Sequence, residues 1–387
     1  MVYRFILLFF LFFYFTGVCY ANLNSKNYQF SVITIGPNQS ELYSAFGHSG
    51  IRYKDDSLGL DYFYNYGIFD FDQPNFYINF LNGRLLYMVG RFDFNQAKKY
   101  YLSENRYIKE QVLNINDSQK IKLLAYLENN LKDENKFYLY NYVYNNCATK
   151  IRDAIDEVLD NKIIYKESTS ELSIRNLMDL YLDHQKWGDL GIDICLGSEI
   201  DKNSNYFSSM FLPDFLFNSL EEATLPDGSN VVYKTYISEP INTSNTNYFI
   251  TPFIVFFLLF IVSLFISIKE LKYGLRYNKF DFLLFFLSGI IGCLITYLWF
   301  FTDHLSANNF NIIWAIPLNL IISFFLFNTK FNSIVNYYLI YYLSSLLILC
   351  FFWIFLPQEL NGSLIFLILT LLIRSCAIIN NNLKLRQ

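Results

Sequence analysis

The feature that most constrains this chain is a series of long apolar runs within residues 249–380. A helix needs about 20 apolar residues to cross the hydrocarbon of a bilayer. Because lipid offers no partner for backbone N–H and C=O groups, such runs must be helical. We therefore expect residues 246–387 to be an all-α membrane domain with five spans, at 249–268, 282–302, 312–327, 335–356 and 363–379.

The charges between these runs predict how the spans are oriented. Basic residues occur between the first two spans, between the third and fourth, and after the fifth: Lys269, Lys272, Arg276, Lys279, Lys330, Lys384 and Arg386. The loops 303–311 and 357–362 contain no lysine or arginine. Since basic loops stay in the cytoplasm, we expect a multi-pass membrane protein with a cytoplasmic C-terminus and with the head outside the cytoplasm.

The N-terminus carries a second targeting signal. One basic residue, Arg4, precedes an apolar run from residue 5 to residue 15, and small residues precede Ala21. This pattern is typical of a secretory leader, so residues 1–21 are expected to be a signal peptide, with an uncleaved anchor as the alternative. Both alternatives make residues 22–245 an exported domain, in agreement with the loop charges.

Composition narrows the choice of partners. Hydrophobic residues make up 53% of the chain and aromatic residues 20%, and the formal net charge is -4. This apolar excess points to lipid. The acidic balance, with no basic cluster outside the membrane flanks, disfavours nucleic acid. We therefore expect the membrane, and no nucleic acid, among the partners of this chain.

The head mixes strand and helix patterns. Alternating apolar residues predict strands at 30–35 and in the run HSGIRY, and a turn at 55–59 leads to a third strand at 62–66. Helical periodicity predicts helices at 95–104 and 118–131. The head is therefore expected to be an α+β domain.

The segment YNNCATKIRDAIDEVLDN contains the most informative cysteine. Asn145 and Asn146 are N-cap candidates, so a helix is expected to begin at Cys147. The unpaired N–H groups and the dipole at a helix start favour a thiolate and lower a thiol pKa from its usual ~8.5. The same N–H groups can stabilise an oxyanion. Cys147 is therefore a candidate nucleophile.

A disulfide is the competing interpretation of this cysteine. The chain has six cysteines, but only Cys147 and Cys195 lie in the exported head, because Cys19 falls in the leader and the other three fall in or near the spans. Two cysteines in an oxidising compartment commonly form a bridge. Both interpretations of Cys147 stay open from the residues alone.

A thiol nucleophile needs a base within hydrogen-bond reach. The head offers His48, on a strand beside the small residues Gly47, Ser49 and Gly50, and His184, among polar residues. We expect His48 to be the base, because its small neighbours let a substrate approach. A cysteine at a helix start paired with a strand histidine is the papain-like arrangement, here with the histidine first in the chain.

The residue that orients His48 is expected on the strand after the turn. Asp61, Tyr64 and Asn65 are the candidates there, and Asn65 is our choice. We expect no cofactor and no metal. Candidate substrate contacts are Glu41, Tyr43, Arg52, Arg84, Asn146 and, beside Asp303 in a loop expected to face the head, His304.

Two sets of motifs resemble known families. The run NNCATKIRD after GHSGIRY is similar to the circularly permuted NlpC/P60 class, although Ala148 and Thr149 stand where an Asn-Cys-Glu-His-Phe signature has Glu-His. A nearer resemblance, to the Lnb-type lipoprotein N-acyltransferases of Bacteroidota, covers almost the whole chain. It is carried by TIGPNQSELYSAFGHSGIRY, DYFYNYGIFDFDQPNFYINFLNGRLLYM, YNNCATKIRDAI, GIDICLGSEID, MFLPDFL and DHLSANNFNIIWAIP.

This resemblance implies an α+β permuted papain-like (NlpC/P60-like) head followed by an all-α polytopic membrane domain. It implies that residues 22–245 are a periplasmic catalytic domain and that the spans lie in a bacterial inner membrane. It also implies transfer of an acyl chain from a phospholipid to the α-amine of a diacylglyceryl-cysteine lipoprotein, through a thioester on Cys147. A membrane-anchored cysteine peptidase, amidase or phospholipase of the same class is the first alternative, and it leaves five spans unexplained where one anchor suffices. A non-enzymatic membrane assembly factor, with Cys147 bonded to Cys195, is the second.

Overall fold

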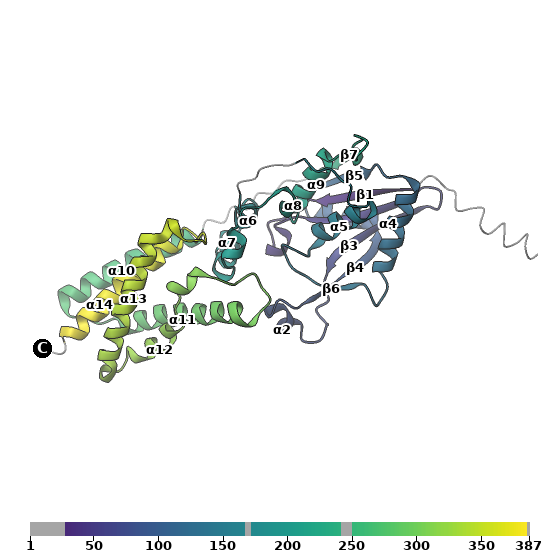
Figure 1. Cartoon of the computed structure of the whole chain (residues 1–387). Coiled ribbons are helices and arrows are strands. Elements are labelled where there is room, and N and C mark those ends of the chain that lie inside the picture. The colour runs from purple at the N-terminus through teal and green to yellow at the C-terminus, as the bar shows by residue number, and fades with distance from the viewer. Residues whose placement is uncertain (1–27, 167–171, 241–249, 385–387) are drawn as a thin grey trace, which may run out of the picture.

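The computed structural model describes residues 28–166, 172–240 and 250–384. In these ranges a head of strands and helices precedes a bundle of long apolar helices (Figure 1). The predicted order of an α+β head and an all-α membrane domain is therefore confirmed. The predicted signal peptide, residues 1–21, lies outside the described residues.

An antiparallel sheet forms the centre of the head, and its described strands have the order β6-β4-β3-β2-β1-β5-β7. Its middle strands are β1 (Tyr28–Ile35), β2 (His48–Asp55) and β3 (Leu60–Ile68). They contain the three predicted strands, and the predicted turn joins β2 to β3. The outer strands are β4 (Leu86–Asp93), β5 (Ile108–Leu113), β6 (Phe137–Leu139) and β7 (Val232–Ser238).

Helices cover both faces of the sheet because side chains alternate along each strand. The α4 (Asp117–Asn130), α5 (Cys147–Val158) and α9 (Pro213–Glu222) helices share one apolar core with the sheet, and α3 (Phe94–Ser103) packs against the other face. The predicted helices at 95–104 and 118–131 correspond to α3 and α4. The smaller elements are η1 (Leu42–Ser44), α2 (Phe76–Leu81), α6 (Ile174–Asp179), α7 (Lys186–Cys195), η2 (Ser198–Asp201) and α8 (Tyr206–Ser209).

In the described part of the chain, four helical segments are long and apolar enough to cross a membrane. They are α10 (Pro252–Tyr273), α11 (Asn278–Phe301), the segment Thr329–Phe355 and α14 (Leu364–Lys384). These segments overlap the first, second, fourth and fifth predicted spans. The segment Thr329–Phe355 consists of η4 (Thr329–Phe331), α13 (Asn332–Phe352) and η5 (Trp353–Phe355).

The third predicted span, 312–327, is only partly a regular helix. The chain passes through η3 (Phe310–Ile313) before α12 (Leu318–Phe325) begins. With eight residues, α12 is roughly 12 Å long, well short of the ~30 Å of hydrocarbon. Gly289 and Gly292 of α11 touch the backbone of this segment so closely that a β-carbon at either would clash. The irregular chain is thus covered by protein, as membrane depth requires.

Polar contacts at α7 join the head to the membrane domain. The side-chain amides of Asn309, Asn311 and Gln358 donate hydrogen bonds of 2.7, 2.8 and 2.9 Å to carbonyl groups at the end of α7. The last carbonyls of a helix have no partner within it, so these bonds complete the helix. The loops that lack lysine and arginine therefore contact the head (Figure 1).

Arg374 of α14 is the centre of a buried ion cluster. It is fully buried, and its guanidinium contacts Glu270 of α10 at 2.9 Å and Asp281 of α11 at 2.6 Å. A long basic side chain near the end of a span can extend its charge to water. Arg374 instead pairs with two carboxylates from neighbouring helices inside the bundle.

Replacement of Arg374 by alanine would leave both carboxylates buried without a cation. We expect Arg374→Ala to lower the free energy of unfolding by roughly 3–5 kcal/mol, measured by tryptophan fluorescence during SDS titration in mixed micelles. Arg91→Ala is the control, since Arg91 forms an exposed pair with Glu128 and such pairs contribute little. Equal effects of the two substitutions would contradict the structural role of the cluster.

Candidate active site

The entry into β2 fixes the position of His48. Gly47, directly before it, has a φ of +81°, which side chains disfavour. A β-carbon at Gly47 would also lie 2.9 Å from the carbonyl oxygen of Ile35. This glycine lets the chain turn into β2 so that His48 stands at the end of the sheet.

A hydrogen bond to Asn65 orients the imidazole. Asn65 lies on β3, and its Oδ1 is 2.6 Å from Nε2 of His48. Because a carboxamide oxygen accepts, Nε2 carries the hydrogen and Nδ1 is left as the acceptor nitrogen. The other two candidates are engaged elsewhere, since Asp61 pairs with Arg52 and the Tyr64 hydroxyl donates to a glutamate.

Cys147 and His48 both lie beside Gly67. It is the first residue of α5, and the N–H groups of Ser49, Ala148 and Cys147 itself point at its sulfur. A β-carbon added at Gly67 would lie 3.9 Å from Cβ of Cys147 and 4.0 Å from Cε1 of His48. The structure therefore gathers Cys147, His48 and, through its hydrogen bond, Asn65 at one end of the sheet.

Burial decides the protonation states of this pair. Burial raises the pKa of the Cys147 thiol, and the surrounding N–H groups offset this only in part. This outcome differs from the lowered pKa that the helix start predicts, because desolvation of a thiolate outweighs the helix-start effect. Burial also lowers the pKa of His48 to about 4, although the bond to Asn65 opposes the shift. At neutral pH the site thus holds a neutral thiol and a neutral imidazole.

Arg106 is a member of the site that no sequence motif indicates. Its side chain is 7% exposed, its Nε donates to the carbonyl of Gly36 at 2.6 Å, and its guanidinium lies 5.2 Å from the centre of the Tyr101 ring. Nη2 has no hydrogen-bond partner among the described residues, whereas the other arginines of the described head each pair with a carboxylate. Its charge, which forms no salt bridge among the described residues, lowers the pKa of both Cys147 and His48.

Arg52 and Asn146 have structural partners. Asp61 and Glu110 hold the Arg52 guanidinium at 2.7 and 2.9 Å. The Asn146 side chain accepts from the N–H of Thr149 at 3.0 Å, and its amide donates to two backbone carbonyls. These contacts favour structural roles for both residues over the substrate contacts expected from the sequence.

The structure also gives no support to the substrate-facing roles expected for Glu41, Tyr43 and Gly50. Glu41 and Tyr43 are exposed beside and on η1, where Tyr43 is 75% exposed. The space expected at Gly50 is filled, because the ring of Phe63 packs directly against it. Gly50 therefore allows core packing rather than the approach of a substrate.

His304 and Asp303 lie where the head meets the membrane domain. His304 Nε2 is 3.1 Å from the carbonyl oxygen of Phe80, and Asp303 binds Arg84 through contacts of 2.7 and 3.1 Å. The loop thus faces the head as expected. Its partner is the loop around α2, and Arg84 is held by a carboxylate.

Cys195 is not bonded to Cys147. Both are free thiols in the structure, and Cys195 ends α7 at the junction with the membrane domain. Burial raises the pKa of the Cys195 thiol as well. The bridge that the assembly-factor interpretation needs is thus not formed in this structure.

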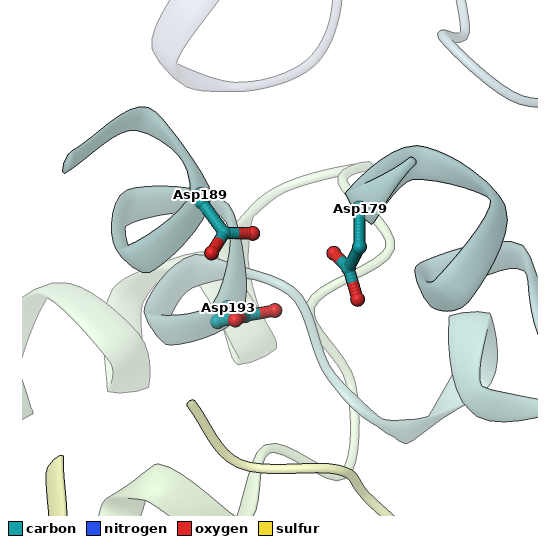
Figure 2. A group of neighbouring side chains, drawn as sticks. All are labelled: Asp179, Asp189 and Asp193. Atoms are coloured by element: carbon teal, nitrogen blue, oxygen red, sulfur yellow. The ribbon is translucent and has the colours of Figure 1, made fainter. Parts of the chain in front are cut away.

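A second group of titratable side chains lies at the junction. Figure 2 shows Asp179, at the end of α6, facing Asp189 and Asp193 on α7. Each offers a carboxylate oxygen, and these oxygens lie within 4.8 Å of one another, close enough to hold a cation. Arg175 already binds Asp193 at 2.6 Å, and Asn361 donates to Asp193 at 2.9 Å. Burial and the two neighbouring carboxylates raise the pKa of Asp179, so a proton can also neutralise this group.

Asp179→Asn is expected to stabilise the head above neutral pH. The raised pKa means that folding retains a proton which the unfolded chain releases above ~3.9, so stability falls as pH rises towards the raised pKa. At pH 8 we expect a gain of roughly 1 kcal/mol, kept small because water reaches part of the carboxyl. Thermal unfolding at pH 4 and pH 8 tests this, with the exposed Asp183→Asn as control. A loss of stability at pH 8 would contradict a protonated Asp179.

Comparison with known protein families gives two matches. The model of the Lnb N-terminal periplasmic domain matches residues 15–179, and the model of the Lnb transmembrane domain matches residues 243–385. No curated protein and no solved structure matches the chain. The first match contains His48, Asn65, Arg106 and Cys147, and the second contains the apolar helices.

Proposed function

The chain belongs to the Lnb family, and from this premise we propose that it is a lipoprotein N-acyltransferase. The family supports an enzyme of lipoprotein maturation with a periplasmic head on a membrane domain. The proposed reaction moves an acyl chain from a phospholipid to the α-amine of a diacylglyceryl-cysteine lipoprotein. The observation that carries this proposal is that Cys147, His48 and Asn65 lie at one end of the sheet, around Gly67, in a head fixed to apolar helices.

The first half of the proposed reaction forms a thioester. Nδ1 of His48 takes the thiol proton as the sulfur of Cys147 attacks the ester carbonyl of the phospholipid. When the ester C–O bond breaks, the same proton passes to the leaving alkoxide, and a lysophospholipid departs. The N–H groups around the sulfur support the developing oxyanion. The charge of Arg106 favours the thiolate.

The second half transfers the acyl chain to nitrogen. The lipoprotein amine attacks the thioester carbonyl, the C–S bond breaks, and His48 carries the proton from the amine to the departing thiolate. Water must be excluded during this half, since hydrolysis of the thioester would make the protein a phospholipase. The 7% exposure of Cys147 supports such exclusion.

A membrane domain fits a reaction between two lipid-anchored substrates. Both stay in the outer leaflet of the inner membrane, so the enzyme meets them without the entropic cost of collecting them from solution. We place the C-terminus in the cytoplasm, because the basic loops lie away from the head. This arrangement gives the apolar helices a role that a peptidase with a single anchor would not need.

Three substitutions test the site. In cells that depend on this protein for N-acylation, Cys147→Ser should abolish the third acyl chain of a lipoprotein. His48→Ala should slow its formation by about 10²–10⁴-fold, as removal of a general base does. Asn65→Ala should slow formation of the third acyl chain by roughly 10–100-fold. This is the rate effect of losing one hydrogen bond to an imidazole that becomes positively charged in the reaction. Mass spectrometry of the lipoprotein N-terminus measures all three.

The matched controls are Cys195→Ser and His184→Ala, which change the same residue types outside the site and should leave N-acylation intact. Equal amounts of the third acyl chain in every variant, and in cells lacking the protein, would refute the acyltransferase. Lysophospholipid release without an acylated lipoprotein would instead identify a phospholipase. Cleaved cell-wall peptides would identify the peptidase or amidase.

The pH profile offers an independent test. Because the pKa of His48 is lowered to about 4, the base stays neutral well below the ordinary ~6.5. We expect kcat/KM to hold as pH falls and to decline only near pH 4, measured as lysophospholipid release in nanodiscs. Arg106→Gln should move the acid limb upward, since its charge contributes to the shift. A wild-type acid limb near 6.5 would contradict a buried His48 base.

A further inference from the structure

The loop between β3 and β4 exposes a group of large apolar side chains. Residues 69–85, called the α2 segment from here on, contain the short helix α2. On its surface Tyr77 is 79% exposed, Ile78 59% and Phe80 57%. Exposure of several neighbouring apolar side chains marks an interaction surface.

The α2 segment contacts α11 at the end that meets the head. The Tyr297 hydroxyl donates to Asn82 Oδ1 at 2.6 Å, and the N–H of Asp303 donates to the Asn82 carbonyl at 2.9 Å. Gly83, with a φ of +70°, allows the α2 segment to approach the loop after α11. A β-carbon at Gly83 would lie only 3.1 Å from the backbone nitrogen of His304. Figure 1 shows α2 beside this end of α11.

The apolar surface of α11 continues onto the α2 segment. Phe300 and Phe301, the last residues of the span, are 66% and 64% exposed. The exposed surface of a membrane span faces lipid. We therefore expect the exposed apolar side chains of the α2 segment, which lies beside this end of α11, to contact the outer leaflet. Aromatic rings with a polar edge prefer this interface.

Aromatic rings lead from α2 to the thiol. The ring of Phe76 lies 6.1 Å from that of Phe69, Phe69 lies 5.3 Å from Tyr87, and Tyr87 stacks on Tyr140 at 4.1 Å. A β-carbon at Gly67 would lie 3.7 Å from the Tyr140 ring and 3.9 Å from Cβ of Cys147. Tyr140 and Cys147 therefore lie beside the same glycine. Phe69, Tyr87 and Tyr140 are each partly exposed. These linked rings, called the track from here on, connect the α2 segment to the residues around Cys147.

We propose that the α2 segment inserts into the outer leaflet and that the track from Phe69 to Tyr140 guides the acyl chain of a phospholipid to Cys147. Insertion depends only on the surface and its junction with α11. The guiding role rests on the proposed acyl transfer. The occupant is lipid rather than another protein, because the surface adjoins the lipid-facing end of a span.

Photocrosslinking in nanodiscs tests insertion with the full chain. The bilayer contains a phospholipid with a diazirine in its acyl chain, and adducts are mapped by mass spectrometry. We expect adducts on residues 76–81 at a level similar to those on Phe300 and Phe301. Strand β7 is the internal control, because it lies at the edge of the sheet opposite β6 and β4 (Figure 1) and its Tyr233 is 76% exposed. Adducts on α11 with none on 76–81 would overturn insertion.

A pair of variants tests the guiding role. One combines Tyr77→Ser, Ile78→Ser and Phe80→Ser; its control combines Tyr233→Ser and Ile237→Ser. Acylation of Cys147 is measured by intact mass, with phosphatidylethanolamine vesicles or with a soluble short-chain p-nitrophenyl ester as donor. The ratio of the vesicle rate to the soluble rate should fall about tenfold in the first variant and stay constant in the control.

The two experiments separate the possible failures. A constant ratio in the α2 variant, with its lipid adducts lost, overturns the guiding role. A wild-type protein that is acylated by neither donor refutes the proposed acyl transfer instead. The crosslinking result still decides insertion in that case, because it requires no reaction at Cys147.

Discussion

The site depends on one buried amide, the side chain of Asn146. Its oxygen caps the first turn of α5, and its nitrogen donates to the carbonyls of Tyr142 and Phe211 at 2.9 and 2.8 Å. A single side chain thus ties the start of α5 to two other segments. Because a buried polar group without partners costs about 1–3 kcal/mol, the amide specifies where α5 begins. The N–H groups that face the Cys147 sulfur are positioned as a result.

The chemistry of the pair follows from competition between burial and local charge. A helix start alone favours a thiolate, but the surroundings that exclude water from Cys147 penalise the charged form more strongly. The same burial keeps His48 neutral and able to accept a proton. Arg106 adds a positive charge that forms no salt bridge among the described residues, and this charge favours the thiolate. Under the proposed function, the thiol would then pass its proton to His48 during attack on the ester rather than rest as an ion pair with it.

Local patterns predicted much of this fold, and contacts between distant segments account for most of what they missed. Strand alternation, the β2–β3 turn and the helix start at Cys147 are encoded by adjacent residues. Residue type left Asp61, Tyr64 and Asn65 as candidates to orient His48, and only the structure shows that Asn65 bonds to it. Arg374 is different, because its partners Glu270 and Asp281 lie 104 and 93 positions away. Arg106 likewise stands out only in the folded structure, which shows that it forms no salt bridge among the described residues and acts on both Cys147 and His48. The non-helical start of the third span depends on glycines in α11 that no local pattern connects to it.

The amide bonds that the membrane loops make to the end of α7 have a further consequence. They complete the helix of the head with groups from the membrane domain, so the head is held at one height relative to the spans. A thiol at a fixed height can be reached only by atoms that the bilayer presents at that depth. Under the proposed function, acceptors would then be chosen by how close to the membrane their amine lies. The amino-acid sequence of the attached protein would matter little.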